Sequence, residues 1–94
     1  MAFQIIFQEE AVVDIQDTYF WYESQFKNLG EEFLEELDII IEKLQQNPQY
    51  FGYSFDEFRD ARLKRFPYLV IFKIEGNKVY INTVRHIRRK PRTR

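Results

Sequence analysis

The residues best suited to chemistry in this sequence gather toward its C-terminal end. His86 is the only histidine of the chain, and an imidazole suits proton transfer because its pKa lies near neutrality. Arginine suits phosphate binding because its guanidinium fork binds two oxygens at once and stays charged. The cationic side chains expected around His86 are Lys64, Arg65, Arg85, Arg88, Arg89 and Lys90. Together these residue types predict a phosphate-binding surface with an imidazole among its cations.

Metal-free RNA cleavage is one reaction that such a surface could carry out. It needs a base for the 2′-hydroxyl, cations for the crowded phosphorane and an acid for the leaving 5′-oxygen. In this interpretation His86 is the acid or base, and Glu57 or Tyr53 supplies a second proton-transfer group. The residues that stabilise the phosphate are Arg65, Arg85, Arg88 and Arg89. The alternative interpretation is that His86 hydrogen-bonds backbone at a strand end.

Other kinds of site have no support in the sequence. There is no glycine-rich phosphate loop, no metal-ligand spacing and no Ser/His/Asp arrangement, so we expect neither a cofactor nor a metal. The run Phe20-Trp21-Tyr22 could stack bases, or it could be core with one ring at the rim.

The elements that must position these residues follow from hydrophobic periodicity. Residues 2–8 partly alternate, which predicts a strand. Apolar residues then recur every three or four positions over residues 9–27 and again from Leu29 to Leu44, which predicts two helices separated at Asn28-Leu29-Gly30 and ended by Asn47-Pro48. The face expected to pack in the first helix consists of Ala11, Ile15, Tyr19, Tyr22 and Phe26.

Three strands are predicted after an aromatic loop at residues 49–58. They cover residues 59–66, 68–74 and 79–86, and Gly76-Asn77 forms a tight hairpin turn between the last two. The whole pattern predicts an α+β domain over residues 1–94, with an N-terminal strand, an antiparallel helical hairpin and three antiparallel strands, the helices packing on one face of the sheet.

The hairpin predicts which side chains share a face. If Glu75 pairs with Lys78, one face holds Val70, Phe72 and their partners and should pack on the helices. The opposite, open face then carries Leu69, Ile71 and Val84 together with His86. Apolar side chains on an open face suit an amphipathic helix or strand of a partner protein. The alternative is that the C-terminal tail buries them.

Charge divides the chain into two blocks. Residues 1–60 contain 14 acidic and 3 basic residues, whereas residues 61–94 contain 11 basic and 1 acidic residue, although the whole chain carries a net charge of −1. The blocks predict one surface that attracts polyanions, including a basic tail at residues 85–94, unless the two halves neutralise each other. The absence of cysteine and of a signal-peptide or membrane-spanning pattern favours a cytoplasmic protein.

Several short segments, in this order, resemble the RelE/ParE toxins of bacterial type II toxin–antitoxin systems. They are Phe20-Trp21-Tyr22-Glu23, Leu29-Gly30-Glu31-Glu32-Phe33, Asn47-Pro48, the run 63–72 and the run 84–91. The resemblance implies a toxin that acts on a nucleic-acid machine and is neutralised by a cognate antitoxin, which would bind Leu69, Ile71 and Val84.

The family implies two targets. RelE-like members cut mRNA on the ribosome, and ParE-like members poison DNA gyrase. RelE-like nucleases typically carry arginine directly after the tyrosine of the central strand, whereas Tyr68 is followed here by Leu69. Three hypotheses stay open: a toxin acting on gyrase or the ribosome, a metal-independent endoribonuclease, and a non-toxic nucleic-acid-binding module.

Overall fold

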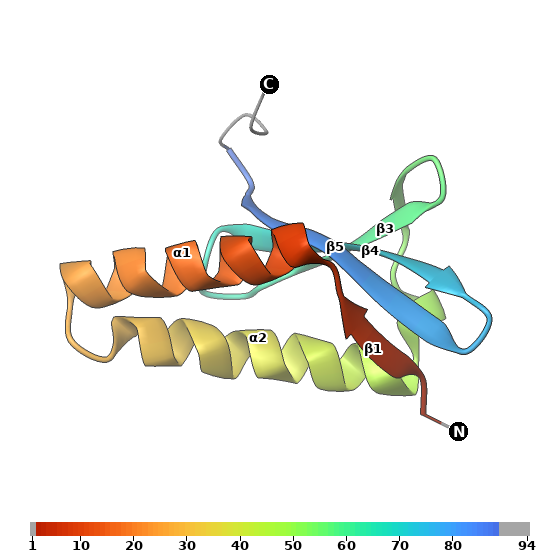
Figure 1. Ribbon diagram of the computed structural model, residues 1–94, viewed down its shortest axis with the longest axis horizontal. Helices are drawn as coiled ribbons and strands as arrows, with labels where there is room; N and C mark the ends of the chain where they lie inside the picture. The colour runs from red at the N-terminus through yellow and green to blue at the C-terminus, as the bar shows by residue number, and fades with distance from the viewer. Residues whose placement is uncertain (1, 89–94) are drawn as a thin grey trace.

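The N-terminal strand leads directly into a helical hairpin. In the computed structural model, which describes residues 2–88, strand β1 (Gln4–Phe7) is followed by two antiparallel helices, α1 (Glu9–Gln25) and α2 (Leu29–Gln46) (Figure 1). No helix in residues 2–88 combines the length and the apolar character needed to span a membrane.

The helices are joined by a turn that Glu23 holds in place. Asn28 adopts the left-handed conformation with φ 69°, which asparagine tolerates better than most residues. The Glu23 carboxylate accepts hydrogen bonds from Asn28 N at 3.2 Å and Gly30 N at 2.8 Å. A Cβ on Gly30 would lie 2.7 Å from the carbonyl oxygen of Tyr19. Glycine therefore permits the close approach of α1 and α2.

A short 3₁₀ helix, η1 (Pro48–Tyr50), leads into the remaining strands. These are β2 (Tyr53–Phe55), β3 (Phe58–Arg62), β4 (Tyr68–Glu75) and β5 (Lys78–His86). The sheet order is β1-β5-β4-β3-β2, with β1 parallel to β5 and all other neighbours antiparallel. The predicted α+β architecture is confirmed. The sequence did not indicate β2, which has only three residues, and the predicted strand 59–66 ends at Arg62.

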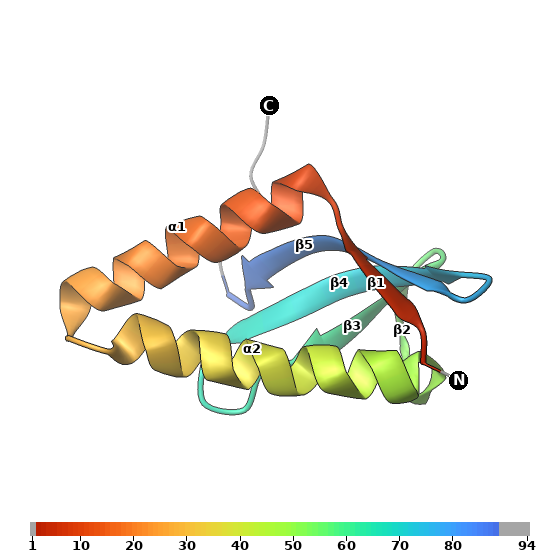
Figure 2. The ribbon, with the colours of Figure 1, turned by 60° about the horizontal axis from the view of Figure 1, so that its bottom comes forward.

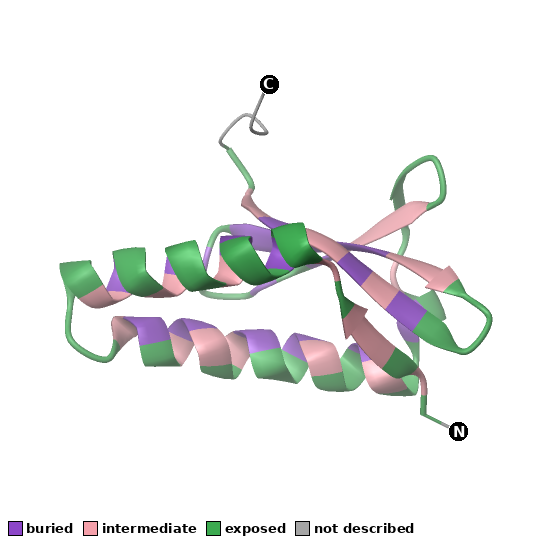
Figure 3. Ribbon diagram, in the orientation of Figure 1, coloured by how far each residue is buried: buried purple, intermediate pink, exposed green. Residues whose placement is uncertain are grey.

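The two helices cover one face of the sheet (Figure 2), and the core lies between the layers. Four aromatic rings meet where the two helices turn back on each other. Tyr22 contacts Phe66 with 4.9 Å between ring centroids, and Phe33 contacts Tyr68 at 5.8 Å. Figure 3 shows the buried positions following the inner sides of the helices and the central strands.

One position of the predicted helix face is wrong. Phe26 is 73% exposed, whereas Ala11 and Tyr22 are buried as expected. The reason is that α1 ends at Gln25 and Phe26 has extended backbone angles, which take its side chain away from the buried stripe.

The hairpin register begins as predicted and then changes. Glu75 pairs with Lys78 and Phe72 with Ile81, but the next pair is Ile71 with Thr83, so Asn82 is an extra residue in β5. This β-bulge shifts every later pair by one residue. The final pair is Tyr68 with His86.

Because of the bulge, the residues at the end of β5 lie on the opposite faces from those predicted. Val84, expected on the open face, pairs with Val70, is 2% exposed and belongs to the core beneath the helices. Leu69 and Ile71 do face away from the helices, but they are 8% and 1% exposed, so the expected open apolar patch is wrong. Both residues lie on β4, which has strand neighbours on both sides, so side chains on β3 and β5 flank them.

Candidate nucleic-acid or partner interface

Four basic residues form the candidate interface at one end of the sheet. Arg62 ends β3, Lys64 lies in the β3–β4 loop, Arg85 lies near the end of β5 and Arg88 follows that strand. Within residues 2–88, none of the four is within 4.0 Å of a carboxylate. We call Arg62, Lys64, Arg85 and Arg88 the basic rim.

The register places two of these arginines on either side of one buried residue. Leu69 pairs with Arg62 on β3 and with Arg85 on β5, so the three form a row across the sheet on the face away from the helices. Arginine can lay its aliphatic stem along apolar surface while its guanidinium stays in water. The row therefore suits contact with an anionic surface.

His86 lies on the opposite face of the sheet from Arg85. Its ring contacts the ring of Tyr68 with 5.1 Å between centroids, beside the aromatic core. The Nδ1 atom accepts a hydrogen bond from Arg88 N at 3.0 Å. This bond requires an unprotonated Nδ1, so a neutral ring carries its proton on Nε2. The hydrogen bond to backbone at a strand end agrees with the non-catalytic interpretation of this histidine.

Arg65 is held by carboxylates of α2. Its Nη2 donates to Glu32 at 3.0 Å, its Nε donates to Glu36 at 3.2 Å, and its backbone N–H donates to the other oxygen of Glu36 at 2.8 Å. The hydrogen bond to Glu32, followed by that to Glu36, raises the pKa of Arg65. A phosphate at this guanidinium would meet two carboxylates already bound there and would be repelled by them.

The second proton-transfer groups considered for His86 lie elsewhere. The Glu57 carboxylate lies 3.6 Å from Lys73 Nζ, and the Glu75 carboxylate lies 3.1 Å from the same atom. Pairing with Glu75, followed by pairing with Glu57, raises the pKa of Lys73. Lys73 is five residues along β4 from Tyr68, the neighbour of His86, or roughly 17 Å at the rise of a strand. Tyr53 lies on β2, and its hydroxyl accepts a hydrogen bond from Arg59 at 2.9 Å.

The structure thus divides the residues that the sequence grouped as one site: Lys64, Arg85 and Arg88 stay together in the basic rim, whereas His86 and Arg65 do not. His86 faces the helices, Arg85 faces the other way, and Arg65 is bound to α2. Arg89 and Lys90 lie outside the described residues. Within residues 2–88, no group of three His, Cys, Asp or Glu side chains could hold a metal ion.

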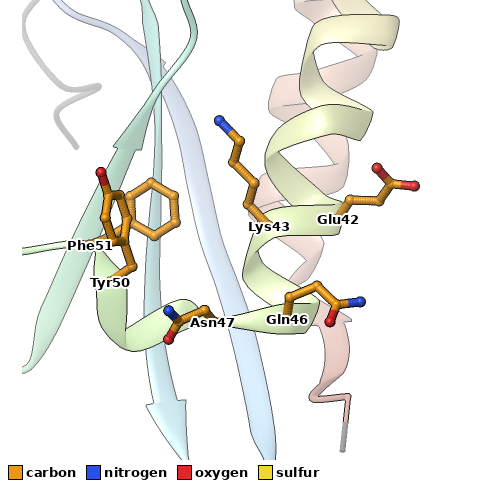
Figure 4. A pocket seen from close by; sticks show the side chains of 6 residues that line it. All are labelled: Glu42, Lys43, Gln46, Asn47, Tyr50 and Phe51. Carbon is orange, nitrogen blue, oxygen red and sulfur yellow. The ribbon is translucent and has the colours of Figure 1, made fainter.

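A pocket of about 280 Å³ lies at the other end of α2. Figure 4 shows the rings of Tyr50 and Phe51 on one side and α2 side chains, including Lys43, on the other. None of the residues proposed from the sequence for catalysis, phosphate binding or antitoxin binding lines it. The basic rim and this pocket are separate features.

The charge of the helical layer limits what can bind there. Residues 9–46 contain 11 acidic and 2 basic residues. On α1, Phe20 and Trp21 are 66% and 48% exposed, whereas Tyr22 is buried. Their acidic surroundings repel phosphate, which argues against the base-stacking interpretation of this run.

Asp14 is a residue near the site that the sequence analysis did not single out. It is 8% exposed and accepts hydrogen bonds from the Thr83 hydroxyl at 2.5 Å and from Val84 N at 3.1 Å. The available signal was its position: Asp14 is three residues after Ala11 and four before Thr18, both of which lie on the buried stripe of α1.

Comparison with known proteins identifies the fold and the family. One solved structure, titled "Chromosomal ParDE TA system from P. aeruginosa", superposes with a TM-score of 0.80 at 16% sequence identity and covers 92% of this chain and 97% of its own. No curated protein matches the sequence. The profile of the family described as "ParE toxin of type II toxin-antitoxin system, parDE" matches residues 5–91. The chain therefore belongs to the ParE toxin family of type II toxin–antitoxin systems.

Proposed function

We propose that this ParE-family toxin inhibits growth by acting on DNA gyrase, without cutting RNA, and that a cognate antitoxin neutralises it. The observation that carries the proposal is the dispersal of the nuclease candidates. A ribonuclease site needs its acid, base and cations within hydrogen-bond reach of one phosphate. Here the Arg65 guanidinium is bound to Glu32 and Glu36, and Arg85 and His86 lie on opposite faces of the sheet.

The basic rim is the surface proposed to contact the target. Its side chains make no ion pair within residues 2–88, so their charge is available to an anionic partner. The DNA that gyrase binds is a polyanion, and clustered arginines would attract it from a distance. A toxin bound to gyrase would act in the cytoplasm.

The antitoxin is proposed to cover the same rim. The expected contact through Leu69, Ile71 and Val84 is revised, because all three side chains are buried. An acidic segment laid across Arg62 and Arg85 would neutralise the rim and block access to the target. Like charges in the helical layer would disfavour binding of such a segment there.

Induced expression with two readouts tests the proposal. The chain is expressed briefly in bacteria, alone or with the adjacent reading frame, and both mRNA 5′ ends and the DNA-damage response are followed. We expect growth arrest with DNA damage, unaltered mRNA ends, and rescue by the neighbouring gene. Codon-phased mRNA cuts that disappear in His86→Ala would support the ribonuclease instead. Unimpaired growth would favour the non-toxic nucleic-acid-binding module.

A further inference from the structure

We infer that Asp14 of α1 is a positioning residue that sets the register of the end of β5 and so decides which of its side chains the toxin displays. The two strands pair evenly from the turn to Phe72 and Ile81, and pairing resumes at Ile71 and Thr83 after the extra residue Asn82. Asp14 contacts β5 directly after this extra residue.

Asp14 contacts the edge of β5 just beyond the point where the pairing of β5 with β1 ends. The parallel pairing of β1 with β5 ends at Phe7 and Ile81, and the last bond runs from Gln8 N to the Ile81 carbonyl at 2.9 Å. The chain then turns into α1 and leaves the sheet. Beyond that point, the backbone N–H of Val84 needs another acceptor, because Val84 is buried and a buried unpaired N–H is costly.

One carboxylate oxygen of Asp14 supplies this acceptor. Its Oδ2 receives both the Thr83 hydroxyl, at 2.5 Å, and Val84 N, at 3.1 Å. The two donors are consecutive residues, so a single buried carboxylate fixes both the backbone and a side chain directly after the bulge. Charge-assisted hydrogen bonds of this kind are stronger than neutral ones. The contact spans 70 residues of sequence.

The bulge reverses the faces of the last residues of the strand. With it, Val84 enters the core, His86 contacts Tyr68, and Arg85 joins Leu69 on the face away from the helices. Uninterrupted pairing would turn Arg85 toward the helices and Val84 and His86 outward. Asp14 therefore selects the arrangement that puts Arg85 in the basic rim, and the consequence for toxicity rests on the proposed function.

Nuclear magnetic resonance of the 94-residue chain tests the register without any assay of toxicity. The wild-type protein should show cross-strand contacts between Val70 and Val84 and between Tyr68 and His86. In Asp14→Ala, we expect these contacts to weaken or to shift by one residue, and the Val84 amide to exchange about tenfold faster. The matched control is Glu10→Ala, which removes an exposed carboxylate from α1 and should leave both readouts unchanged.

Two milder variants keep the test decisive if Asp14→Ala does not fold. Thr83→Val removes one donor at nearly constant shape, and Asp14→Asn keeps an oxygen that can accept from Val84 N. We expect faster Val84 exchange in both, with the register retained in Asp14→Asn. Unchanged Val70–Val84 and Tyr68–His86 contacts in a folded Asp14→Ala protein would overturn the inference. So would a Val84 exchange rate within about twofold of the wild type in every folded variant at Asp14 or Thr83.

Growth assays test the functional consequence separately. A folded Asp14→Ala protein with the shifted register should lose growth inhibition, as Arg85→Gln should. A shifted register with full toxicity would overturn the link between Asp14 and the displayed surface. If the wild-type chain itself proved harmless, the proposed function would fail, but the register result would stand on its own.

Discussion

Two arginines that look alike in the sequence occupy opposite situations in the fold. Arg65 is bound to Glu32 and Glu36 through its side chain and its backbone. Arg85 lies beside Leu69 on the sheet face away from the helices, and within residues 2–88 no carboxylate is close enough to pair with it. Arg65 ties the β3–β4 loop to α2, whereas Arg85 makes no ion pair within residues 2–88.

The difference shows that the position of a basic residue in the sequence does not reveal whether a carboxylate pairs with it in the fold. The C-terminal third is strongly basic, yet its cations divide between internal ion pairs and the basic rim. Pairing of Arg65 and Lys73 with glutamates uses part of the positive block. Both outcomes occur within the block, because Arg65 and Lys73 are paired whereas the residues of the basic rim make no ion pair within residues 2–88. The following changes test this division.

Removing the rim charges should have the largest effect. In the double variant Arg85→Gln/Arg88→Gln, we expect growth inhibition to fall by at least about tenfold, the loss that corresponds to about 1.4 kcal/mol of contact energy. The free energy of unfolding should change by no more than about 0.5 kcal/mol. Dose-controlled expression and chemical denaturation measure the two quantities. Full toxicity in this variant would show that the rim is not the working surface.

A substitution that displaces α2 should weaken the contacts between Arg65 and α2 and leave the basic rim unchanged. Gly30→Ala places a Cβ against the Tyr19 carbonyl, and we expect it to lower the free energy of unfolding by about 1–3 kcal/mol, as overpacked contacts do. Gly52→Ala is the control, because a Cβ there meets nothing within 4 Å. Equal stability of the two variants in urea would contradict this account of the helical hairpin.

Loss of the Arg65 ion pairs should have a smaller effect. Arg65→Ala should lower the denaturation midpoint but leave toxicity intact, since this arginine is placed in the scaffold. The difference from the wild type should shrink in about 1 M NaCl, which screens exposed charges. Lys64→Ala, which removes an exposed neighbouring cation with no ion pair within residues 2–88, should not change the midpoint. A salt-independent effect of Arg65→Ala would point to lost packing on Phe66.

The smallest effect concerns the hydrogen bond between Tyr19 of α1 and Glu31 of α2 and appears only at high pH. The Tyr19 hydroxyl donates to Glu31 at 3.0 Å, and this bond raises the pKa of Tyr19 above its usual value. The folded state therefore holds the phenol proton more tightly than the unfolded state. Its contribution to stability is present below about pH 10 and is lost as the pH rises through the folded-state pKa. Denaturation curves of Tyr19→Phe should not show this loss of stability at high pH. If the variant and the wild type had the same dependence of stability on pH, the contribution of the Tyr19–Glu31 hydrogen bond would be excluded.

The parts of the fold that depend on nearby residues were predicted from the sequence. The break between the helices at Asn28, the end of α2 before Pro48 and the hairpin pair Glu75–Lys78 all follow from local backbone preferences. Gly76, with φ +61°, supplies the conformation that the turn requires.

The parts that depend on distant residues were not predicted. Nothing near Asn82 indicates an extra residue in β5, because the bulge is tied to Asp14, and so the predicted faces of Val84 and His86 were wrong. The partners of Arg65 lie 29 and 33 residues away on α2. Alternation along a strand predicts faces only while the pairing stays regular.

The most direct test of the proposed function uses purified components. The chain is incubated with bacterial DNA gyrase, ATP and supercoiled plasmid, and separately with a translation reaction in which mRNA ends are mapped. We expect plasmid DNA cleaved in complex with gyrase, loss of that cleavage in Arg85→Gln/Arg88→Gln but not in His86→Ala, and intact mRNA. Undamaged plasmid together with mRNA cleavage that requires His86 would contradict the account.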